Sequence, residues 1–326
     1  MRIYAGIDEA GYGPMLGPLV IGRSVFRIND DDFDNAPPSL WDRWPDAVCQ
    51  ALRDKKHRIA IADSKKVYKP KGGLRNLERG VLGFMRLVDL VPGSVEDLLS
   101  MLAIDANCGF GPQPWYTPNG NPPVTIPRDI SEPEIKIAGS QLRTAMSGVG
   151  DALVNVGAAV VYEDRFNHMV AATRSKAACS WTFVASHLVY IWERFGSEHP
   201  YVVVDRQGGR KAYLTPLRLA FDGADFTVLQ ESKDTSQYRI TRQGRSMTVS
   251  FETGGETRHL PIALGSMIAK YIRELVMIRF NSFWSQHITD LKPTAGYVQD
   301  GRRFMKDIDP ALRKLDINPN VLIRQR

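Results

Sequence analysis

Apolar residues recur along this chain with two different periods, which predicts a protein that mixes strands and helices. Residues 2–7 and 18–26 are β-prone apolar runs separated by a turn rich in Gly and Pro, so we expect an N-terminal hairpin. Between residues 74 and 91, apolar side chains recur every three or four positions, as on one face of a helix. The same reasoning predicts helices over 40–52, 95–104, 134–146, 173–195, 264–280 and 301–308, and strands over 58–62, 158–162, 201–205, 226–230, 237–241 and 246–252.

The length and composition fit a soluble globular protein. The 326 residues, 43% apolar and 24% charged, allow one large domain or two small ones. No run of about 18 apolar residues indicates a membrane span, and two acids stand where a signal peptide would need an apolar core. The three cysteines, Cys49, Cys108 and Cys179, form neither a disulfide framework nor a C-x-x-C metal site. We therefore expect free thiols in a reducing cytoplasm.

The balance of charge suits a polyanionic partner, although many basic proteins bind no nucleic acid. The chain has 42 Lys and Arg against 36 Asp and Glu, a net charge of +6 and a pI near 9.2. Residues 92–133 are rich in Pro and hold Trp115 and Tyr116 at their centre. These two aromatic residues could stack on a base, but we expect them to fix the loop onto the core.

Candidate chemistry begins with Asp8 and Glu9, which follow the first strand and precede Gly11 and Gly13. Glycines let a partner approach the backbone closely, although an acid pair at a surface turn is the simpler interpretation. Asp205 ends the continuously apolar run 201–205, and α/β sheets place their sites at such strand ends. A capping role for Asp205 at a turn stays equally open.

Residues 6–20, GIDEAGYGPMLGPLV, resemble the opening signature of ribonuclease HII, G-I-D-E-A-G-R-G-P-x-x-G-P-V-V. The evident departure is Tyr12, which stands where the family has Arg. Four later segments are similar to family motifs and follow in the family's order. They are Asp63-Ser64-Lys65-Lys66 (D-S-K-K), the strand ending at Asp205, Ser266 to Glu274 (S-I-I-A-K-V-x-R-D, with Glu for the final Asp) and Gly296-Tyr297 (K-G-Y-x-T).

The resemblance implies a ribonuclease H-like fold, in which helices flank a mixed central sheet. A catalytic domain would span 1–309, with insertions at about 92–143 and 230–260 that the family motifs do not cover, and 310–326 would form a C-terminal tail. The implied activity is a metal-dependent endonuclease. It would hydrolyse the phosphodiester 5′ to a ribonucleotide, in an RNA–DNA hybrid or a ribonucleotide-containing duplex, by two-metal-ion catalysis.

The resemblance also implies the residues of the site. Clustered carboxylates repel one another, and a hard divalent cation such as Mg²⁺ or Mn²⁺ would compensate them. The implied catalytic and metal-binding residues are Asp8, Glu9, Asp205 and Glu274, with Asp8 and Asp205 as direct ligands. The implied nucleic-acid contacts are Gly11, Tyr12, Gly13, Ser64, Lys65, Lys66, Lys270 and Tyr297.

Other interpretations stay open for several of these residues and for the function. Lys270 and Glu274 are four residues apart on a helix and could form a surface ion pair of little energetic value. The chain could be a non-catalytic nucleic-acid-binding relative that the Tyr12 and Glu274 departures mark as inactive. An actin-like ATPase is a weaker alternative: 204–209 faintly resembles its second phosphate loop, but Pro14 and Pro18 stiffen the first turn.

Overall fold

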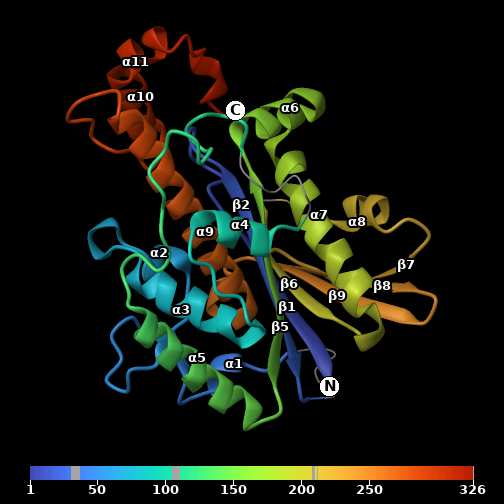
Figure 1. Cartoon of the computed structure of the whole chain (residues 1–326). Coiled ribbons are helices and arrows are strands. Elements are labelled where there is room, and N and C mark those ends of the chain that lie inside the picture. Colours follow the sequence, from blue (N-terminus) through green and yellow to red (C-terminus); the bar gives the residue numbers. More distant parts are fainter. Residues whose placement is uncertain (31–36, 105–110, 208–209, 211, 326) are drawn as a thin grey trace.

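A seven-stranded mixed sheet with helices on both faces forms the centre of the protein, which confirms the predicted fold class (Figure 1). The computed structural model describes residues 1–30, 37–104, 111–207, 210 and 212–325. The strand order is β5-β2-β1-β6-β9-β8-β7, and β3 and β4 pair separately. The strands are β1 Arg2–Ala10, β2 Leu19–Ile28, β3 Val48–Cys49, β4 Ile59–Ala60, β5 Ala152–Val161, β6 Tyr201–Asp205, β7 Asp225–Glu231, β8 Thr235–Arg242 and β9 Arg245–Glu252.

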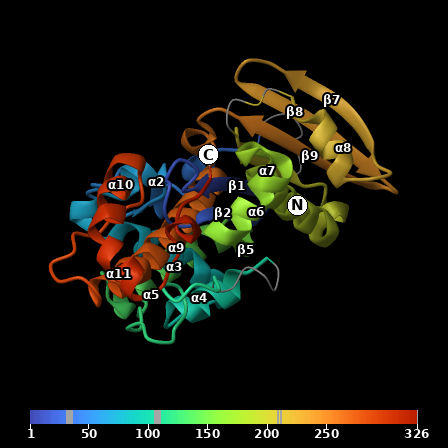
Figure 2. The same ribbon diagram turned by 90° about the horizontal axis from the view of Figure 1, so that it is seen from above.

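Two groups of helices cover the two faces of the sheet, and each group encloses its own apolar core (Figure 2). α9 lies across one face with α3 and α5 beside it, while α6, α7 and α8 cover the other. The helices are α1 Leu40–Arg43, α2 Ser64–Val67, α3 Arg75–Met85, α4 Val95–Leu102, α5 Glu132–Ser147, α6 Glu163–Thr173, α7 Lys176–Phe195, α8 Leu214–Ala220, α9 Leu260–Ser285, α10 Val298–Asp307 and α11 Asp309–Lys314.

The predicted N-terminal hairpin is present, and β1 is longer than expected. β1 pairs antiparallel with β2, with Asp8 opposite Gly22, and parallel with β6. α9 approaches β1 so closely that a Cβ on Gly6 would lie 2.1 Å from the backbone N of Ile262. Because β1 continues to Ala10, Asp8 and Glu9 lie inside the strand, and their side chains leave opposite faces of the sheet.

One predicted helix was wrong for an identifiable physical reason, and two others are present with shifted bounds. The helix expected over 40–52 ends at Arg43, because Trp44 precedes Pro45 and the residue before a Pro avoids helical geometry. The helix expected over 173–195 is present as α7, which begins at Lys176; Arg174, in the left-handed region at φ 53°, ends α6 just before it. The helix expected over 264–280 is present as α9, which is longer and runs from Leu260 to Ser285.

The segment 230–260, which the sequence suggested to be an insertion, contributes strands to the central sheet. β9 pairs parallel with β6 and antiparallel with β8, so it is an interior strand, and β7 forms the edge. The turn between β8 and β9 has Gln243 and Gly244 at positive φ, as a two-residue hairpin turn requires. This pairing brings the end of β9 next to the end of β6.

The Pro-rich segment fixes its two aromatic residues in the core, as expected. Trp115 and Tyr116 are each 1% exposed. The Trp115 ring packs at 5.6 Å from that of Trp284, and the Tyr116 hydroxyl donates to Glu163 at 2.7 Å. Neither side chain is available to stack on a base. No helix within the described residues is both long and apolar enough to cross a membrane.

Candidate active site

A cavity of about 290 Å³ opens where β1 and β6 end, and ten of the twelve residues implied for the site line it. Lys66 and Glu274 do not line it. Its other walls come from α2, the turn after β1, the short turn after β9, and α9. The implied residues that line it are Asp8, Glu9, Gly11, Tyr12, Gly13, Ser64, Lys65, Asp205, Lys270 and Tyr297, and they are joined by Ala10, Pro14, Asp63, Glu256, Ser266 and Arg273.

Asp8 projects from β1 toward α9 and is largely withdrawn from solvent. Burial and, after it, the nearby charge of Asp205 raise the pKa of the Asp8 carboxyl well above its usual value. Hydrogen bonds from Ser266 and from the backbone N–H of Glu9 oppose this rise but do not cancel it. The Ser266 hydroxyl also lies 3.0 Å from that of Ser64, which ties α9 to the start of α2.

Asp205 ends β6 beside Asp8 and is perturbed in the same direction. Burial, followed by the charges of Glu256 and Glu9, raises the pKa of Asp205 to about 7. Lys65 and the backbone N–H of Arg206 lower it by less. This carboxyl therefore keeps its proton to a higher pH than an exposed aspartate does, unless a cation compensates its charge.

Glu256 is an acid of this cavity that the sequence analysis missed. It lies in the single turn Gly255–Thr257, just after β9, and faces Asp205 across the cavity. Its place follows from the parallel pairing of β9 with β6, because the carboxyl ends of parallel neighbours meet at one edge of the sheet. The sequence signal for Glu256 is an acid shortly after a β-prone run. We overlooked it because we interpreted 230–260 as an insertion.

Glu9 lines the same cavity but is held from the opposite face of the sheet. Its Oε2 accepts hydrogen bonds from the Ser180 hydroxyl of α7 and from Gln207 Nε2, the latter at 3.4 Å. Gln207 Nε2 also lies 2.5 Å from the Ser180 hydroxyl, so the three groups form one network. Burial raises the pKa of Glu9, while these hydrogen bonds and the charge of Arg324 lower it by less.

Glu274 forms the ion pair that the sequence analysis left open as its alternative role. Its Oε1 lies 2.5 Å from Lys270 Nζ and 3.7 Å from Arg273 Nη1. The Glu274 side chain is mostly buried, and Lys270 also lies over the Tyr68 ring, 4.6 Å from its centroid. Lys270 and Arg273 therefore reach the cavity wall, whereas the Glu274 carboxylate is turned toward its partners.

Two buried arginines hold the turn that follows β1. Arg324 donates to the carbonyl oxygens of Gly11, at 2.5 Å, and Pro14. Arg273 lies on the other side, so a Cβ on Gly11, whose φ is +88°, would lie 2.5 Å from its Nε. Arg324 belongs to the segment that the sequence suggested to be a tail, and its side chain is buried. The guanidiniums that support the turn thus come from distant positions, while Tyr12 is half-buried at the cavity wall.

The donor atoms of the cavity suit a hard divalent cation. In the part of the chain that the structure describes, no Lys, Arg or His nitrogen lies within 4.0 Å of the carboxylates of Asp8, Glu9, Asp205 and Glu256. No group of three or more described His, Cys, Asp or Glu side chains is arranged to hold a metal ion. Mg²⁺ is commonly bound through one or two carboxylates with water completing its shell, so Asp8 and Asp205 fit such an ion.

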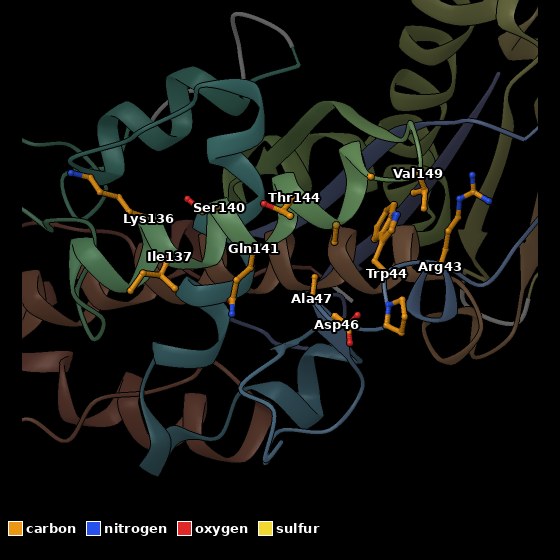
Figure 3. Close-up of a pocket in the computed structure, with 13 residues that line it drawn as sticks. Arg43, Trp44, Asp46, Ala47, Lys136, Ile137, Ser140, Gln141, Thr144 and Val149 are labelled. Atoms are coloured by element: carbon orange, nitrogen blue, oxygen red, sulfur yellow. The ribbon is translucent and has the colours of Figure 1, made fainter.

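A larger cavity lies elsewhere and has a different character (Figure 3). It measures about 800 Å³ and lies between the α1 region and α5. Trp44, Ile137 and Val149 give it apolar walls, and Asp46 is its one acidic lining residue. The clustered carboxylates, rather than cavity size, identify the smaller cavity as the candidate site.

Comparisons with known proteins give similarity of structure alone. No protein-family model matches the sequence, and no characterised protein matches it significantly. The ribonuclease HII of Archaeoglobus fulgidus, solved in complex with PCNA, is 14% identical, with a TM-score of 0.42 over 99% of this chain and 94% of that one. Ribonuclease H2 of Pyrococcus horikoshii OT3 is 14% identical, with a TM-score of 0.40 over 98% and 92%. Bst-RNase HIII in complex with Mn²⁺ is 13% identical, with a TM-score of 0.40 over 99% and 66%. Similarity this distant assigns no activity to the chain.

Proposed function

We propose that this protein is a metal-dependent endonuclease that hydrolyses the phosphodiester 5′ to a ribonucleotide in an RNA–DNA hybrid or a ribonucleotide-containing duplex. The observation that carries the proposal is the cavity in which Asp8 and Asp205 lie beside Lys65 and the glycine-containing turn. The motifs of the sequence, in their order along the chain, support the choice of substrate.

The residues of the cavity divide into those that hold a cation and those that hold the substrate. Asp8 and Asp205 would bind Mg²⁺ or Mn²⁺, with Glu256 adding negative charge beside Asp205. Such a cation supplies an activated water and stabilises charge on the leaving oxygen. Glu9 would complete the site, whereas Glu274 would contribute only after leaving its ion pair with Lys270.

The other walls present groups suited to a nucleic-acid backbone. Lys65 is exposed at the start of α2 and can contact a phosphate, and the neighbouring Ser64 adds a hydroxyl to the cavity wall. Gly11 and Gly13 let the backbone of the turn approach a ribose, whose 2′-hydroxyl distinguishes RNA from DNA. Tyr297, which is 55% exposed, also lines the cavity and can contact the sugar.

A cleavage assay on three matched duplexes tests the proposal. The duplexes are an RNA–DNA hybrid, DNA with one ribonucleotide, and plain DNA, each with Mg²⁺ and with Mn²⁺. We expect nicking of the first two only, and loss of nicking in Asp8→Asn. The matched control Asp222→Asn, an exposed acid outside the cavity, should cleave as the wild type does. Tight binding of the first two duplexes without nicking in either metal would support the non-catalytic alternative.

A further inference from the structure

A second polar cavity, of about 240 Å³, lies at the end of the sheet opposite the acids. Its polar lining consists of Arg2, His199, Tyr201, Arg239, Ser246 and Thr248, and none of its lining residues is acidic. Arg2 is at the start of β1, near the N-terminus marked in Figure 1. Since Asp8 is six residues further along β1, the two cavities are roughly 20 Å apart.

The register of the sheet brings the lining residues together. Thr248 pairs with Tyr201 of β6 on one side and with Arg239 of β8 on the other. Directly paired residues project from the same face, and Ser246, two residues before Thr248, shares that face. The cavity is therefore built on the backbone pairing of three strands.

Arg239 differs from the neighbouring arginines because it has no acidic partner among the described residues. Arg242 and Arg245 lie 3.7 and 3.8 Å from the carboxylate of Glu193. Arg239 has no carboxylate within 4.0 Å among the residues that the structure describes, although it is half-buried in the sheet. Its guanidinium therefore lines the cavity as an uncompensated positive charge.

The remaining polar groups add hydrogen-bonding capacity to this charge. His199 has a left-handed backbone, φ 49°, and its Nδ1 lies 2.9 Å from the Ser246 hydroxyl. That contact orients the imidazole ring and uses Nδ1, so Nε2 is the nitrogen left to meet a ligand. The Thr248 hydroxyl stands beside Arg239 on the adjacent strand. A ligand would meet a guanidinium, an imidazole and hydroxyl groups, and no acid.

We propose that this cavity binds a phosphate group. Guanidinium groups match the oxygens of phosphate in both charge and fork geometry, and hydroxyl and imidazole donors complete such a site. The volume is below the roughly 300–1,000 Å³ of cavities that hold drug-sized ligands, so one phosphate with a short substituent fits better than a whole nucleotide. The phosphate can come from a small phosphomonoester or from a nucleic-acid backbone, and the site does not depend on the catalytic proposal.

Calorimetric titration of the intact protein with inorganic phosphate tests the site. We expect Arg239→Gln to weaken binding roughly tenfold or more, because a hydrogen bond to a charged group is lost. The matched control Arg218→Gln removes an exposed arginine of α8 outside the cavity and should bind phosphate as the wild type does. Thr248→Val, which keeps the charge and removes a hydroxyl, should weaken binding by less. Melting curves identify any variant that fails to fold.

A second arm titrates a DNA duplex at several salt concentrations to distinguish the two sources of phosphate. If the duplex backbone supplies it, Arg239→Gln also weakens duplex binding and reduces its salt dependence by about one phosphate contact. If a small phosphomonoester supplies it, duplex binding is unchanged while inorganic phosphate binding falls. The proposal is overturned if the wild type binds no phosphate, or if folded Arg239→Gln and Thr248→Val bind it as the wild type does.

Discussion

Replacing Asp205 by Asn should stabilise the metal-free protein, and the gain should grow as the pH rises. The pKa of Asp205 is raised from 3.8 to about 7 by burial and by neighbouring acids. The unfolded chain therefore binds fewer protons at this residue than the folded chain does, so stability falls as pH increases between the two values. The stabilisation that protonated Asp205 gives the folded state is fully present below about pH 4 and is lost once the pH has passed about 7.

The size of the effect follows from this shift. A change of about three pKa units corresponds to about 4 kcal/mol between the two limits, of which roughly 3 kcal/mol falls between pH 5 and pH 8. Asp205 keeps part of its surface in solvent, so these figures are upper values. Asparagine has nearly the same shape as aspartate and cannot ionise, so the substitution removes the pH-dependent contribution of this residue from the free energy of folding.

Urea unfolding in the presence of a chelator, at pH 5 and at pH 8, measures the prediction. The wild type should lose stability relative to Asp205→Asn between the two values. Asp222→Asn, an exposed acid outside the cavity, should follow the wild type. If Asp205→Asn lost as much stability as the wild type over this range, Asp205 would not be a perturbed carboxyl and the electrostatic account of the cavity would be wrong.

Three further predictions concern neighbouring features. Glu256→Gln removes a charge that raises the pKa of Asp205, so the pH-dependent loss of stability should move to lower pH in the same unfolding series; an unchanged midpoint would contradict this. Gly11 has a positive φ, and a Cβ there would lie against a buried guanidinium, so Gly11→Ala should lower the free energy of unfolding by about 1–3 kcal/mol in thermal unfolding. Gly13→Ala, which has open space around its Cβ, should lower it far less. Equal losses of stability in the two variants would refute the tight packing of the turn. Trp115→Ala should cost about 3–5 kcal/mol because the ring is buried, and a loss below 1 kcal/mol would place it in solvent.

Local patterns predicted the elements whose cause is local. The run 201–205 is apolar at consecutive positions because the strand is buried on both faces, and it forms β6 within the predicted bounds. The N-terminal hairpin was predicted from its two apolar runs, and β1 and β2 pair as expected. The short α1 was misjudged because the helical pattern over 40–52 outweighed the single Pro45 that stops it.

What the sequence could not supply is long-range pairing, and the site depends on it. β9 pairs with β6 from more than forty residues away, and no local signal in 245–252 distinguishes an interior strand from an edge strand. Glu256 was missed for that reason. Glu274 followed from a motif, but the motif does not show that Lys270 and Arg273 bind its carboxylate.

Manganese binding to the metal-free protein, followed by electron paramagnetic resonance, tests the central claim that Asp8 and Asp205 together hold a divalent cation. The wild type should bind Mn²⁺, and Asp8→Asn and Asp205→Asn should each weaken binding at least about tenfold, as for the loss of a ligand worth about 1.4 kcal/mol or more. Asp222→Asn should leave binding unchanged. Wild-type affinity for Mn²⁺ in both cavity variants would show that these two carboxylates hold no cation.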